Sequence, residues 1–189
     1  MLYETLTYLK QKLELFFFDG KKKSEPLIML SAPWSNNVNN DKNGNAPFLN
    51  SISLINIEEE KIFKTNTQQI IPQKNGTYLK KQPDLKINLY LLISSYNKNY
   101  EDSLKFISRV IGFFQRKNVF EGDDLPPAIE KLIIDLYSTN FDEQNQVWTS
   151  LSAGYLPSVI YKVRMLMVDG EPIDTAEYKL IHEIDTNVS

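Results

Sequence analysis

The sequence contains no cysteine among its 189 residues. Disulfide bonds, thiol nucleophiles and thiolate metal sites are therefore excluded. A single histidine cannot share a zinc ion with a second imidazole, and the seven glycines form no phosphate-binding pattern such as Gly-x-Gly-x-x-Gly. These absences remove several common catalytic and cofactor-binding centres, and we expect no cofactor.

The chain also lacks a strong charge of either sign and a long apolar run. Its net charge is -3, with 42% hydrophobic and 24% charged residues, as in ordinary globular proteins. The only basic run, Lys21–Lys23, is typical of a solvated turn, so we expect no nucleic-acid partner. Apolar runs such as 89–93 are too short to span a bilayer, and no secretory signal is visible. We expect a soluble protein that assembles in a reducing cytoplasm.

Three segments have the pattern of helices. Apolar residues recur at spacings of three and four over residues 2–17. Asn99 is a suitable N-cap for a second helix. Asn140, followed three residues later by Glu143, predicts a capping box for a helix that ends near Leu151 and places Trp148 in a core. We assign the apolar face of the second helix to Leu104, Ile107, Ile111 and Phe114, widened by Phe106, Val110 and Phe113.

The remaining apolar segments predict strands. Residues 85–93 alternate cleanly but carry apolar side chains on both faces, which indicates a central strand. Asn75-Gly76 predicts a hairpin turn between residues 69–71 and 77–79. Further strands are expected at about 26–31, 51–58, 131–136, 157–168 and 178–184. This order predicts an α+β fold, a mainly antiparallel or mixed sheet with helices packed on it.

Candidate catalytic groups are sparse. We interpret His182 as a structural residue because no second ligand or catalytic partner accompanies it. Acidic residues cluster at 58–60, 123–124 and 142–143, which are typical of solvated faces and a helix cap. Carboxylates from separate segments can form an acid–base pair, so a small hydrolase stays an alternative.

Two cations, Lys162 and Arg164, lie on one face of the predicted strand at 157–168, and the other face is apolar. Both could be solvated. Alternatively, they could form a subunit interface, since arginine can bind a neighbour's carboxylate through two hydrogen bonds. The pattern alone favours neither interpretation.

Several segments in order resemble the cap, or tail-terminator, proteins of contractile injection systems, the phage-tail-like particles of bacteria. The resemblance spans most of residues 1–170 and does not include the polar segments 35–46 and 68–84. It is carried by the order and spacing of Ile52-Ser53-Leu54, the run from Leu85 to Leu92, Tyr100–Leu104, Ile111–Gln115 with Val119-Phe120, Val147-Trp148 and Tyr155–Arg164.

The resemblance implies a structural protein without enzymatic activity. Such a protein would form a homo-hexameric ring that closes the distal end of the inner tube and the sheath, inside a particle that is later released or membrane-anchored. A ring requires heterologous contacts between identical subunits. Residues 1–170 would form one domain, and 171–189 an arm that adds a strand to a sheath subunit. The expected subunit or sheath interface comprises Lys162, Arg164, Tyr178, Leu180 and His182. A monomeric adaptor that docks one strand is a further alternative.

Overall fold

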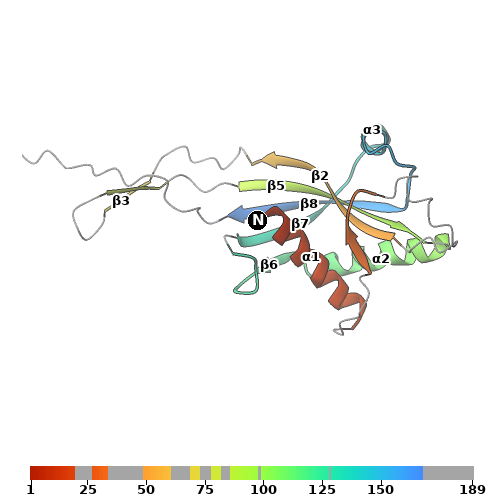
Figure 1. Ribbon diagram of the computed structural model, residues 1–189, viewed down its shortest axis with the longest axis horizontal. Helices are drawn as coiled ribbons and strands as arrows, with labels where there is room; N and C mark the ends of the chain where they lie inside the picture. The colour runs from red at the N-terminus through yellow and green to blue at the C-terminus, as the bar shows by residue number, and fades with distance from the viewer. Residues whose placement is uncertain are drawn as a thin grey trace, which may run out of the picture.

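A six-stranded sheet organises the chain, as the computed structural model in Figure 1 shows. The structure describes residues 1–19, 27–33, 49–60, 69–72, 78–81, 86–97, 99–127 and 129–167. Its helices are α1 (Leu2–Phe17), α2 (Tyr100–Arg116) and α3 (Phe141–Ser150). Its strands are β1 (Ile28–Leu30), β2 (Leu49–Glu59), β3 (Gln69–Pro72), β4 (Tyr78–Lys81), β5 (Lys86–Tyr96), β6 (Val119–Glu121), β7 (Ile129–Tyr137) and β8 (Ser158–Met167). The predicted α+β class is confirmed.

The strands of the main sheet follow the order β1-β2-β5-β8-β7-β6. The short edge strand β1 runs parallel to β2, and the other pairs are antiparallel. Strand β5 pairs with β2 on one side and β8 on the other, so its prediction as a central strand is confirmed. The register between β2 and β5 shifts between Leu54 and Asn56, which marks a β-bulge.

Helices α1 and α2 cover one face of the sheet (Figure 1). In α1, the buried positions Thr5, Tyr8, Leu9 and Leu13 form one stripe that faces the sheet. In the sheet, Leu89 and Val163 are completely buried beneath the helices. Burying such side chains stabilises the fold by roughly 1.5–3 kcal/mol each.

The prediction for the buried face of α2 is partly wrong. Leu104 and Ile111 were assigned to that face, yet they are 45% and 37% exposed. The face turned to the sheet is instead formed by Ser103, Phe106, Ile107, Val110 and Phe114. The helix carries more apolar residues than one face can hold, so packing on the sheet decides which are covered.

A polar contact fixes the end of the sheet to α1. The Lys12 ammonium lies 2.5 Å from a carboxylate oxygen of Asp124, and the Tyr8 hydroxyl donates to the same oxygen at 3.2 Å. Asp124 belongs to the turn between β6 and β7. The hydrogen bond from Lys12 holds the pKa of Asp124 below its usual value. This acidic residue therefore has a structural partner on α1.

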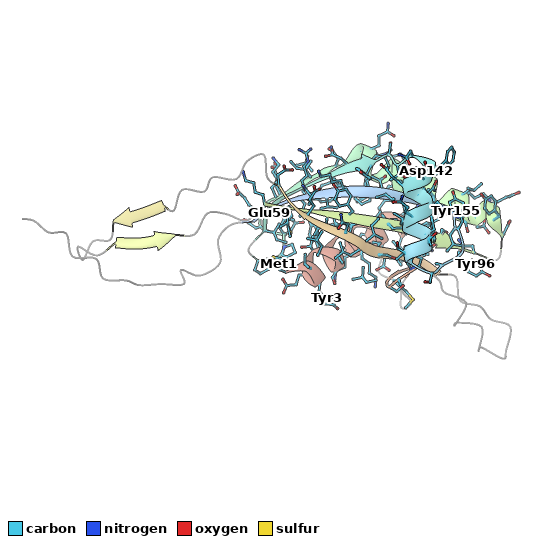
Figure 2. All side chains as sticks on the ribbon, turned by 90° about the horizontal axis from the view of Figure 1, so that it is seen from above. Met1, Tyr3, Glu59, Tyr96, Asp142 and Tyr155 are labelled. Atoms are coloured by element: carbon cyan, nitrogen blue, oxygen red, sulfur yellow. The ribbon has the colours of Figure 1, made fainter. Side chains whose placement is uncertain are left out.

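The predicted hairpin exists as strands β3 and β4, which pair antiparallel from Gln69↔Lys81 to Pro72↔Tyr78. In Figures 1 and 2 the hairpin lies beyond the end of the main sheet where β2 ends and β5 begins. The expected Asn75-Gly76 turn, the polar segment 35–46, the Lys21–Lys23 run and the predicted strand at 178–184 lie outside the described residues.

Candidate interaction surface

Helix α3 covers part of the sheet face opposite α1 and α2 (Figure 1). The Asn140 side chain accepts a hydrogen bond from the Glu143 amide at 2.8 Å, and the Glu143 carboxylate accepts one from the Asn140 amide at 3.2 Å. The predicted capping box is therefore confirmed. Trp148 is 6% exposed and packs with Leu92 and Ile160, which confirms its prediction as a core residue in a second, smaller cluster.

A groove of about 550 Å³ lies between α3 and the sheet. Strands β2, β5, β7 and β8 contribute its floor, and α3 forms one wall. Its twelve lining residues include two carboxylates and no lysine or arginine. They are Ile55, Asn56, Glu58, Tyr90, Tyr137, Thr139, Glu143, Gln146, Val147, Ser150, Leu151 and Ile160. The groove therefore combines apolar and aromatic surface with negative charge.

Tyr90 connects the strands at the floor of the groove. Its hydroxyl donates a hydrogen bond to the Glu58 carboxylate at 2.7 Å, and its ring meets the Tyr137 ring edge-on with centroids 5.0 Å apart. Burial, and then the hydrogen bond to Glu58, raise the pKa of Tyr90 to about 12. The phenol therefore stays protonated at neutral pH and continues to donate to the carboxylate.

The two cations predicted as interface residues lie on the groove's face of β8, opposite the buried Tyr161 and Val163. The Arg164 guanidinium donates from Nε and Nη2 to one oxygen of Asp135, at 3.0 and 2.6 Å. The Lys162 ammonium lies 5.7 Å from the centre of the Tyr90 ring. Arg164 thus has a carboxylate partner within its own chain, and Lys162 stands beside the groove.

The other three predicted interface residues, Tyr178, Leu180 and His182, lie outside the described residues. Sequence reasoning found apolar side chains on both faces of the strand at 85–93 but missed the groove around Tyr90. Its partners Glu58 and Tyr137 come from strands on either side of the β5–β8 pair, so only the strand order and register bring them together. No spacing along the chain signals this arrangement.

Other sites are not apparent in the part of the chain that the structure describes. There, no three side chains among His, Cys, Asp and Glu gather closely enough to hold a metal ion. None of the described helices has both the length and the apolar character needed to cross a membrane.

The fold is an α+β domain with a groove on one face of its sheet, beside α3. The chain belongs to the Pvc16 N-terminal domain family, whose family model matches residues 8–178. A comparison with curated proteins finds no match.

Two solved cryo-EM structures share the fold. One is the PVC sheath/tube terminator of an extracellular contractile injection system in its extended state, with a TM-score of 0.65 and 14% identity over 100% of this chain. The other is the anti-feeding prophage cap, a tube-terminating cap, with a TM-score of 0.59 and 13% identity over 96% of this chain. The matches cover 63% and 59% of those longer chains, so this chain spans about three-fifths of their length.

Proposed function

We propose that this chain is a structural cap, or tail terminator, that closes the distal end of the inner tube and sheath of a contractile injection system. The observation that carries the proposal is the fold shared over the whole chain with a sheath/tube terminator and over 96% of it with a tube-terminating cap. Membership of the Pvc16 N-terminal domain family supports the same role.

A structural role without enzymatic activity agrees with how the acidic residues are used. The Asp124 carboxylate binds Lys12 and Tyr8, Glu143 caps α3, and Glu58 accepts a hydrogen bond from Tyr90. A general acid would need a raised carboxyl pKa, whereas that of Asp124 is lowered. The hydrolase alternative gains no support from these contacts.

The proposed assembly is a homo-hexameric ring. Residues 1–170 form the ring domain, and residues 171–189 form an arm that pairs with a sheath subunit by strand addition. Lys162 and Arg164, with Tyr178, Leu180 and His182 of the arm, form the subunit or sheath interface in this proposal. The ring assembles in the cytoplasm, and the finished particle is then released or membrane-anchored.

The first test is the solution mass of the purified chain, followed by negative-stain imaging of the chain mixed with tube and sheath. Six-fold rings, free or at one end of the tails, support the proposal. A monomer that never decorates a tail end contradicts it, and a monomer that binds one sheath strand supports the adaptor alternative.

The arm has its own test. Deleting residues 172–189 should abolish sheath binding and leave the circular dichroism spectrum and unfolding midpoint of the domain unchanged. Sheath binding equal to that of the full chain would rule the arm out, whatever the outcome for the ring.

A further inference from the structure

The hairpin β3–β4 lies apart from the rest of the described structure. Figures 1 and 2 show it beyond the end of the sheet, with no other described helix or strand beside it. Each of its strands contains only four residues. A two-stranded hairpin is marginally stable at best in water, so one in this position needs another surface to hold it.

The hairpin and the groove beside α3 have opposite charges. The paired strands Gln-Ile-Ile-Pro and Tyr-Leu-Lys-Lys contain two lysines, Lys80 and Lys81, and no acidic residue. The groove is lined by Glu58 and Glu143 and by no cation. Lys162 stands near the Tyr90 ring but is not among the lining residues. The two surfaces therefore carry charges of opposite sign.

The groove has the right size for one short element. Its volume of about 550 Å³ lies within the range of roughly 300–1,000 Å³ that holds a ligand of a few side chains. Tyr90 and Tyr137 offer aromatic surface next to the carboxylates. Aromatic faces attract lysine ammonium groups as well as apolar side chains, so both kinds of hairpin residue suit the groove.

We propose that the β3–β4 hairpin of one copy docks in the groove between α3 and the sheet of a second copy. The inference rests on the proposed ring and names the contact that closes it. The hairpin and the groove are different surfaces of the same chain, so their contact is heterologous and propagates around a ring. The hairpin points away from its own sheet, which favours a neighbour's groove over its own.

The absence of native cysteine makes a direct test possible. Two single variants, Lys80→Cys in the hairpin and Gln146→Cys in the exposed α3 wall, are mixed with tube and sheath and oxidised. Docking between copies predicts a disulfide-linked heterodimer. The matched control pairs Lys80→Cys with Glu130→Cys, which is exposed on β7 outside the groove. We expect about tenfold more heterodimer than in the control, because docking raises the effective concentration of the two thiols.

Charge reversal tests the same contact without cysteine. Glu58→Lys alone and the hairpin variant Lys80→Glu/Lys81→Glu alone should each prevent ring closure. Mixing the two variants should restore it, because in an alternating ring every hairpin faces a groove of opposite charge. Glu130→Lys serves as the matched control and should close rings like the wild type.

The outcomes separate this inference from the proposed function. If tails are capped but the amount of disulfide-linked heterodimer equals that of the control, the hairpin contact is overturned and the cap role is still supported. A disulfide that forms only within a single chain carrying both cysteines shows that the hairpin occupies its own groove. Shielding of the Gln146→Cys thiol from alkylation by added sheath or tube, with no heterodimer, assigns the groove to that partner. Each of these three results overturns the proposal.

Discussion

Replacing Trp148 with alanine should release α3 from the sheet. Trp148 is the buried residue of this ten-residue helix, and it packs with Leu92 and Ile160. A buried aromatic side chain removes about 200 Å² from water, which at about 25 cal/mol per Å² corresponds to about 5 kcal/mol. That figure is an upper estimate because the unfolded chain already covers part of its apolar surface.

We expect Trp148→Ala to lower the free energy of unfolding by about 3 kcal/mol, the lower end of the range for such truncations. The site lies at the margin of the fold, where α3 can move to close part of the cavity. With a denaturant dependence of about 2 kcal/mol per M for urea, the unfolding midpoint should fall by about 1.5 M. Circular dichroism during a urea titration measures this shift.

Phe141→Ala is the matched control because it truncates an aromatic residue on the same helix. Phe141 is 88% exposed, so its removal should change stability by no more than about 0.5 kcal/mol. Hydrogen exchange should show early loss of protection in α3 of the Trp148 variant, with the sheet amides still protected. A midpoint shift equal to that of the control, together with unchanged protection of α3, would refute the assignment of Trp148 as the anchor.

Three further predictions concern polar contacts. Asn140→Ala should lower stability by about 1 kcal/mol in urea unfolding, because it removes the capping box of α3; an unchanged midpoint would contradict that role. Asp124→Asn should flatten the loss of stability in acid. Because the pKa of Asp124 is lower in the folded chain than its ordinary value of 3.8, the carboxylate stabilises the fold at pH values above 3.8. This contribution disappears as the pH falls through the folded-state pKa. Unfolding curves at several pH values measure the loss. Asp135→Asn should cost less than about 1 kcal/mol, because its pair with Arg164 is half exposed; a larger loss would show that the pair is structural.

Local signals in the sequence predicted the helices well. The cap residues Asn99 and Asn140 mark the starts of α2 and α3 in the structure. The periodic apolar residues over 2–17 coincide with the bounds of α1. Each of these signals depends on residues within one or two turns, so no tertiary information is needed.

Signals that depend on packing were less reliable. Seven apolar residues encircle much of α2, and only contact with the sheet shows that Leu104 and Ile111 stay exposed. The edge strand β6 contains three residues, too few for an alternating pattern, and was not predicted as a strand. Its pairing with Lys131–Ile133 of β7 comes from tertiary contact. Periodicity reports an amphipathic surface, but the neighbour determines which part of it is buried.

The groove depends on the bulge in β2. Side chains alternate along a strand, so a regular strand would place Glu58 on the same face as Ile52, which lies under α1 and α2. The register shift between Leu54 and Asn56 inserts one extra residue, Ile55, and reverses the alternation after it. Glu58 consequently lies on the face of Tyr90 and accepts its hydrogen bond. The share of the groove's negative charge that Glu58 supplies is therefore a consequence of one inserted residue, whereas Glu143 comes from α3. Alternation counted along the sequence without this residue assigns Glu58 to the wrong face.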